Sequence, residues 1–108
     1  GNNRLSFTSS DLGVRMKQLV SLRLRGCENV NTAGVKEIGR MCPALTELDL
    51  SMNPHVGKGA LACLVDAKHF RCLSKLKVDD CPHIHDNGLD ALAKGELSAN
   101  IQMLSLQR

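Results

Sequence analysis

The sequence has almost no aromatic residues. Among 108 residues it contains two phenylalanines, Phe7 and Phe70, and neither tyrosine nor tryptophan. The core must therefore be aliphatic, and a site that stacks bases or sugars on rings has almost nothing to be built from. The charge excess is also small, with 14 basic and 11 acidic residues and a net charge of +3. Because phosphate backbones select a dense basic stripe, we expect no nucleic-acid partner.

Long apolar runs and catalytic motifs are missing as well. No apolar stretch approaches the ~18 residues of a transmembrane helix, and residues 1–10 show no secretory signal pattern. There is no G-x-S-x-G, no H-E-x-x-H and no P-loop. We therefore expect no membrane partner, no cofactor and no enzymatic activity. An odd number of widely spaced cysteines favours reduced thiols in the cytoplasm or nucleus; they are Cys27, Cys42, Cys63, Cys72 and Cys81.

A repeated leucine pattern dominates what is present. Four segments read L-x-x-L-x-L; they begin at Leu19, Leu45, Leu73 and Ile101, which are 26, 28 and 28 residues apart. After each of the first three, the apolar period changes from two to between three and four, so each unit is a strand, a turn and a helix. One unit cannot bury its own core, so neighbours must stack. The sequence predicts a single α/β domain over residues 1–108, a curved solenoid of about 3.5 to 4 repeats with parallel strands on the concave side and helices on the convex side.

Helix boundaries carry local signals. Thr32 and Asp86 occupy equivalent positions and are predicted to cap the first and third helices. Cys42, followed by proline, is expected to end the first helix, and Gly95 the third. The middle unit has Gly-Lys-Gly at 57–59 in place of a capping residue, so its helix should start differently.

Three residues past each of the first three strands lies a side chain that can donate a hydrogen bond. These residues are Cys27, Asn53 and Cys81, and each can satisfy backbone groups of the neighbouring repeat where the chain turns. We expect Cys27 and Cys42 to be buried, and Cys63 and Cys72 to be more exposed. The histidines near Cys81, at positions 55, 83 and 85, do not form a common zinc spacing, so no metal site is predicted.

At the level of whole units, the chain resembles leucine-rich repeat proteins. The stretch 22–45, LRLRGCENVNTAGVKEIGRMCPAL, is similar to the cysteine-containing subtype common in F-box proteins, and so is CPHIHDNGL at 81–89. The middle unit departs, with Asn53 in place of the cysteine and no Cys-Pro pair. The resemblance covers residues 19–108 and implies a substrate receptor of the F-box type as one candidate function.

The pattern also divides the chain. Residues 19–44, 45–72 and 73–100 are predicted repeats, 101–108 the strand of an incomplete repeat, and 1–18 a degenerate N-terminal cap. In that cap Leu5 and Phe7 are a candidate strand pair, and Leu12, Val14 and Met16 are candidates to cover the core. Since a last strand without a helix leaves an open edge, we expect either further chain, a second copy or a partner there.

Outward-facing strand residues are the predicted partner-binding site. With Ser21, they are Arg23, Arg25, Glu47, Asp49, Ser51, Lys75, Lys77, Asp79, Met103, Ser105 and Gln107. Opposite charges on adjacent strands, Glu47 beside Lys75 and Asp49 between Arg23 and Lys77, are expected to pair. The sequence thus predicts a noncatalytic module that binds a protein on its concave surface. Two alternatives stay open: the substrate-recognition part of an F-box ubiquitin ligase adaptor, and a structural subunit that docks, into an assembly or a homo-oligomer, through its C-terminal strand.

Overall fold

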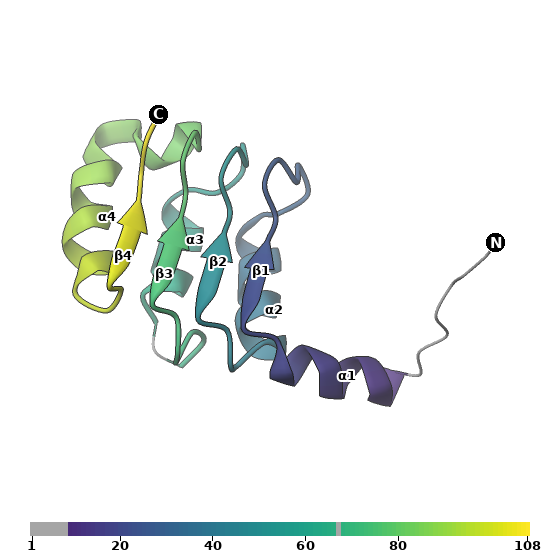
Figure 1. Ribbon diagram of the computed structural model, residues 1–108. Helices are drawn as coiled ribbons and strands as arrows, with labels where there is room; N and C mark the ends of the chain where they lie inside the picture. Colours follow the sequence, from purple (N-terminus) through teal and green to yellow (C-terminus); the bar gives the residue numbers. More distant parts are fainter. Residues whose placement is uncertain (1–8, 67) are drawn as a thin grey trace.

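The computed structural model describes residues 9–66 and 68–108 of the chain (Figure 1). Helices and short strands alternate along it, as the leucine pattern predicts. In chain order the elements are α1 (Ser9–Gln18), β1 (Ser21–Arg23), α2 (Thr32–Met41), β2 (Glu47–Asp49), α3 (Lys58–Leu64), β3 (Lys75–Lys77), the 3-10 turns η1 (Pro82–Ile84) and η2 (Asp86–Gly88), α4 (Leu89–Ser98) and β4 (Met103–Ser105).

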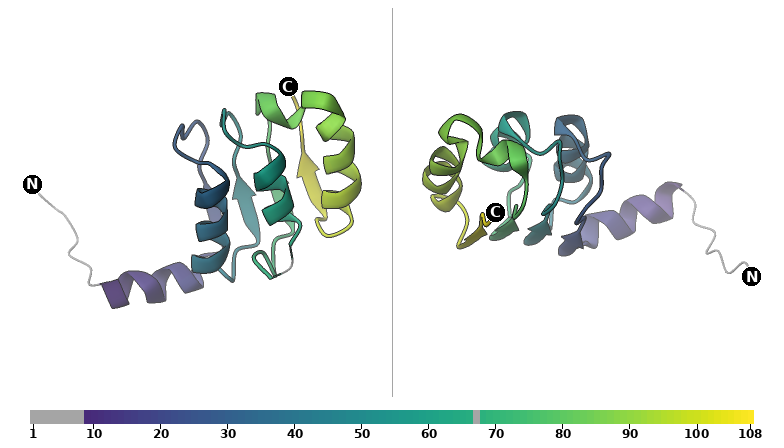
Figure 2. Two further views of the ribbon diagram at one scale, coloured as in Figure 1. Left: turned by 180° about the vertical axis from the view of Figure 1, so that it is seen from behind. Right: turned by 90° about the horizontal axis from the view of Figure 1, so that it is seen from above.

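The four strands form one parallel sheet in the order β1-β2-β3-β4. Its register places Leu22, Leu48, Leu76 and Leu104 opposite one another, so the central leucine of each strand joins a single column. Helices α2, α3 and α4 lie together behind the sheet and leave its other face uncovered (Figure 2). The predicted α/β solenoid, with strands on one side and helices on the other, is confirmed.

The core lies between the sheet and the helices and is aliphatic, as the shortage of rings requires. Leu48 and Leu76 from the strands are 2% and 0% exposed, and Val56 and Ile84 from the turns are fully buried. Phe70 is the single aromatic side chain in this core among the described residues, because Phe7 lies outside them. Burial of these columns is the main stabilising contribution, at roughly 25 cal/mol per Å² of apolar surface.

Tight contacts between neighbouring repeats explain two glycines in the helices. A Cβ on Gly39 in α2 would lie 2.9 Å from the backbone oxygen of His69 and 3.0 Å from the Phe70 ring. A Cβ on Gly59 in α3 would lie 2.6 Å from the hydroxyl of Thr32 in α2. Any larger side chain at either position would push adjacent repeats apart.

The cap of α2 differs from the expectation by one residue. The Asn31 side chain, not that of Thr32, accepts a hydrogen bond from the backbone N–H of Gly34, at 2.9 Å. Thr32 is already the first helical residue, so its hydroxyl is too far along the chain to cap the first turn. The predicted end is confirmed, since the N–H of Cys42 closes the helix on the oxygen of Ile38 at 2.9 Å.

In the third unit the prediction that Asp86 caps the helix is wrong. Asp86 starts the short turn η2, and α4 begins only after Asn87 and Gly88, which have φ values of 52° and 79°. These left-handed residues break the path between Asp86 and the helix. Gly95 does not end α4 either, because the helix continues to Ser98. In the middle unit α3 starts after Gly57 without a side-chain cap, as predicted.

The helix α1 lies at the β1 end of the sheet (Figure 1). Met16 packs partly against the core, as expected of a covering residue, whereas Val14 is 56% exposed, which contradicts the prediction for it. Leu5, Phe7 and the side chain of Leu12 lie outside the described residues. Over the described residues, no helix has the length and apolar character needed to cross a membrane.

Candidate protein-binding surface

The uncovered side of the sheet, which we call the strand face, presents the residues that flank each buried leucine. They form three rows across the strands because the register is uniform. The first row is Ser21, Glu47, Lys75 and Met103; the second is Arg23, Asp49, Lys77 and Ser105; the third, just past the strands, is Arg25, Ser51, Asp79 and Gln107.

The first row contains the predicted ion pair. Nζ of Lys75 lies 3.4 Å from Oε1 of Glu47, and both side chains remain about half exposed, at 54% and 45%. Exposed pairs of this kind contribute about 0–1 kcal/mol to stability. At the end of the row, Met103 is 53% exposed and adds an apolar side chain to a charged surface.

The second row differs from the expectation in its pairing. Asp49 lies between Arg23 and Lys77 in the register, but its carboxylate bonds elsewhere. Oδ1 accepts the backbone N–H of Ser51 at 3.0 Å, and Oδ2 lies 3.5 Å from Nη1 of Arg25. Asp49 itself is only 8% exposed. Arg23 and Lys77 are exposed and, within the described chain, neither forms an ion pair.

The environment of Asp49 keeps its carboxylate charged. Burial raises the pKa of Asp49, but hydrogen bonds from Ser51 and the charge of Arg25 outweigh burial and hold the pKa below its usual value. The carboxylate is therefore ionised at neutral pH, and its bonds are to Ser51 and Arg25 within the chain. It helps to hold the Arg25 side chain in place and offers little surface to a partner.

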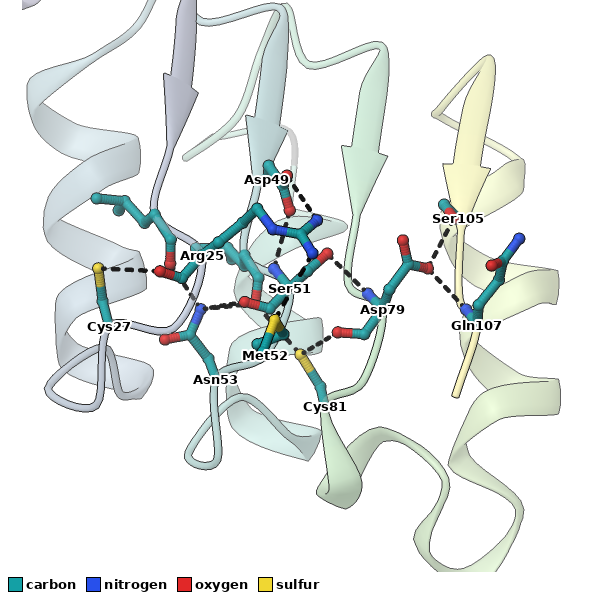
Figure 3. Close-up of polar contacts among 12 residues, drawn as sticks. Arg25, Cys27, Asp49, Ser51, Met52, Asn53, Asp79, Cys81, Ser105 and Gln107 are labelled. Carbon is teal, nitrogen blue, oxygen red and sulfur yellow. Dashed lines mark hydrogen bonds and ion pairs between the residues drawn. The ribbon is translucent and has the colours of Figure 1, made fainter.

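In the third row Ser51 is buried whereas Arg25 and Gln107 are exposed, which corrects the prediction for Ser51. Its side chain is fully buried, and its hydroxyl accepts the backbone N–H of Asp79 at 3.0 Å (Figure 3). Asp79 Oδ1 in turn accepts the Ser105 hydroxyl at 2.6 Å and the Gln107 N–H at 2.7 Å. These polar groups therefore satisfy one another and the backbone where the chain leaves each strand.

Below the third row, the predicted donor ladder is confirmed for Asn53 and Cys81. It is wrong for Cys27, whose thiol lies 3.8 Å from the Arg25 oxygen of its own repeat. The side-chain amide of Asn53 donates to the oxygens of Leu24, at 2.8 Å, and of Leu50, at 2.6 Å. The Cys81 thiol donates to the Leu50 oxygen at 3.2 Å. Each of these two donors thus joins its own repeat to the one before it (Figure 3). The ladder holds the ends of the strands at a fixed spacing, so the strand face is preorganised.

The remaining cysteines and histidines do not converge on one site. Cys42 is buried, as predicted. Cys63 is only 6% exposed, contrary to expectation, because it faces the core from α3. Cys72 is exposed, as predicted, whereas Cys27 is only half-buried, which corrects the prediction for Cys27. Burial raises the pKa of the Cys81 thiol, because the effect of burial is larger than the opposing effect of the backbone hydrogen bonds to the sulfur.

The histidines show no metal-binding arrangement with the residues that the structure describes. His83 Nδ1 lies 2.8 Å from Asp86 Oδ2. The described residues include no His, Cys, Asp and Glu cluster that could hold a metal ion.

A groove of ≈ 480 Å³ runs along the strand face. It brings together seven of the predicted site residues, which are Arg23, Arg25, Glu47, Asp49, Lys75, Lys77 and Met103. Four others, Ser51, Asp79, Ser105 and Gln107, lie outside its lining. The column leucines Leu22, Leu48 and Leu76 also line it, although alternation placed them inward, and no sequence signal distinguishes them from other core leucines. A second hollow of ≈ 460 Å³ lies beside the turn that contains Asp80, His85 and Asp86.

Comparison with known proteins agrees with this architecture. The family model described as Leucine Rich repeat matches residues 42–65 and 70–93. A curated protein named F-box/LRR-repeat protein 4, from Bos taurus, is 33% identical over 88 residues, which are 80% of this chain and 14% of that protein. The chain thus spans about one seventh of the length of this relative. No solved structure matches the chain. From the repeated leucine columns, the stacked parallel strands and these matches, we conclude that the chain belongs to the leucine-rich repeat proteins.

Proposed function

We propose that this chain is a noncatalytic protein-interaction module that binds its partner on the strand face. The observation that carries the proposal is the charged groove of ≈ 480 Å³ on the side of the sheet that none of the described helices covers. The strands beneath it are joined by buried hydrogen bonds from Asn53 and Cys81. A surface that is already ordered loses little conformational entropy when it binds, so more of the contact energy becomes affinity.

The strand face is favoured over the helix side for a physical reason. Its side chains project from a single register, so that charged and apolar groups keep fixed distances across four strands. Interfaces gain specificity from charges arranged to complement a partner, and the strand face offers such an arrangement.

Site-specific photo-crosslinking tests this proposal. A photo-reactive amino acid is placed at Ser21 or Lys77 on the strand face, and at Lys36 or Lys58 on the helix side, in otherwise identical chains. All four side chains are at the surface. The same partner should crosslink from both strand-face positions and from neither helix position, as identified by mass spectrometry. Crosslinks that arise only from the helix positions would contradict the proposal.

A second candidate is the substrate-recognition part of an F-box ubiquitin ligase adaptor. The observation that favours it is the 33% identity to a protein named F-box/LRR-repeat protein 4, together with Cys27 and Cys81 at equivalent turn positions. In this case the strand face would bind the substrate. The cytoplasm or nucleus would then be the location, in keeping with five free cysteines. Affinity purification of the tagged protein should recover a cullin–adaptor complex, and its absence from repeated purifications would count against this role.

The prediction of a structural subunit concerns β4, whose outer edge pairs with no described strand. In β2 the N–H of Leu50 donates to the next strand. The register carries this pattern to β4, so the N–H groups of Leu104 and Leu106 point toward its outer edge. A second copy that paired there would double the molar mass. Light scattering over a range of protein concentrations measures this directly, and a constant monomer mass would contradict docking between copies.

A further inference from the structure

Every acidic residue on the strand face already has a partner within the chain. Glu47 pairs with Lys75 at 3.4 Å, and Asp49 with Arg25 at 3.5 Å. The Asp79 carboxylate accepts two hydrogen bonds from β4 and the residues after it. Each of these carboxylates is therefore already partly satisfied within the chain.

Two cations on the same face are in the opposite situation. Arg23 and Lys77 are exposed, both line the groove, and neither forms an ion pair with the described residues. They stand two strands apart on either side of Asp49. At ~4.8 Å per strand their backbones are about 10 Å apart. Asp49 forms an ion pair with neither of them, because its carboxylate bonds the Ser51 N–H and Arg25.

We infer that the partner bound on the strand face presents an acidic segment, with carboxylates about 10 Å apart that pair with Arg23 and Lys77. This inference rests on the proposed function and adds the chemistry of the partner. The groove carries four basic and two acidic side chains, so its potential is positive. A hollow with walls of low dielectric constant concentrates that potential and steers oppositely charged partners toward it.

The apolar end of the first row adds a second requirement. Met103 is 53% exposed beside Lys75 and Lys77 on the same face. Its flexible thioether adapts to many apolar shapes. A partner that fits this face therefore combines acidic residues with an apolar side chain placed next to them.

A nucleic acid is the less favoured polyanion. Among the residues that the structure describes, the strand face contains no aromatic side chain on which a base can stack. Glu47 and Asp49 lie within the groove itself and would repel a continuous phosphate backbone. An acidic polypeptide can place its charges at intervals and so avoid these two carboxylates.

Selection from a library of random peptides displayed on phage, followed by fluorescence anisotropy with the selected peptides, tests the inference. The double variant Arg23→Glu/Lys77→Glu removes the two cations. The matched control Lys36→Glu/Lys58→Glu makes the same change in net charge on the helix side, at two exposed lysines. Ser21→Trp/Met103→Trp blocks the face without changing charge. Circular dichroism of each variant verifies that it is folded.

We expect the selected peptides to be rich in Asp and Glu. Their affinity should fall about 10-fold or more in Arg23→Glu/Lys77→Glu at low ionic strength, mainly through slower association, and should stay unchanged in the control. Neutral or basic selected peptides whose binding is lost in the tryptophan variant would overturn the acidic partner while supporting the strand face. Peptides that bind every variant equally would contradict both proposals. Absence of any selected peptide, or single-stranded DNA that binds more tightly than the acidic peptides, would overturn the inference.

Discussion

Removing the side-chain amide of Asn53 should show how strongly adjacent repeats are coupled. Asn53 is fully buried, and its amide donates to three backbone oxygens, those of Leu24, Leu50 and Ser51, at 2.8, 2.6 and 3.2 Å. The first of these belongs to the preceding repeat. In Asn53→Ala the Leu24 oxygen loses this donor, whereas the Leu50 oxygen keeps the Cys81 thiol and the Ser51 oxygen keeps the backbone N–H of Gly26.

The expected magnitude follows from these contacts. A buried acceptor left without a donor costs about 1–3 kcal/mol. Two short bonds are lost, and a small cavity adds to the cost. One term opposes this, because Asn53 Oδ1 is buried without a partner and is removed as well. We therefore expect Asn53→Ala to lower the free energy of unfolding by about 2–4 kcal/mol, a large share of the ~5–15 kcal/mol that holds a typical domain.

Asn53→Cys is the matched comparison. It installs the side chain found at the equivalent positions 27 and 81, and the Cys81 thiol already donates to the preceding repeat at 3.2 Å. Because a thiol is a weaker donor than an amide, Asn53→Cys should cost less than Asn53→Ala but more than nothing. Urea unfolding followed by far-UV circular dichroism measures both, since the chain has no tryptophan to report by fluorescence. A loss below about 0.5 kcal/mol in Asn53→Ala, or equal losses in both variants, would refute the coupling argument.

Three further predictions concern packing, thiols and pH. Gly39→Ala should destabilise the protein by about 1–3 kcal/mol in thermal unfolding, because its Cβ would press on the backbone of the next repeat. Gly95→Ala, where a Cβ meets nothing within 4 Å, should instead stabilise α4 by about 0.5–1 kcal/mol. In the native protein, alkylation read by mass spectrometry should modify exposed Cys72 quickly, and Cys81 only on unfolding, because burial raises the pKa of the Cys81 thiol. Because the pKa of Asp49 is lowered in the folded state, its contribution to stability is complete above about pH 4 and is lost as the pH falls further. Urea midpoints over that range should therefore fall less steeply in Asp49→Asn than in the wild type.

Each of these predictions has a clear contrary result. If neighbouring repeats were loosely packed, both glycine substitutions would stabilise the protein, so similar stabilisation by both would contradict the tight contact at Gly39. Alkylation of Cys81 at the rate of Cys72 would show that the ladder opens readily. Parallel acid profiles for Asp49→Asn and wild type would mean that other carboxylates dominate the acid transition.

The repeat architecture could be predicted because it depends on local periodicity. A unit of 26 or 28 residues, with leucines at strand spacing followed by apolar residues at helix spacing, has one way to bury its apolar side against an identical neighbour. The register of the sheet, with Leu22 opposite Leu48, follows from the same repeat. The donor role of Asn53 could also be predicted, because every repeat must turn at that point.

The sequence by itself thus determined the aliphatic solenoid, its parallel sheet and the row in which each outward residue stands. Only the tertiary structure decided which of those residues a partner can reach. Ser51 and Asp49 occupy outward positions in the alternation, yet both are buried on the central strand β2 or just after it, and Asp49 pairs with Arg25 instead of Arg23. Solvent exposure and charge pairing depend on backbone curvature and side-chain reach between repeats, which a pattern of residue types along one chain does not contain.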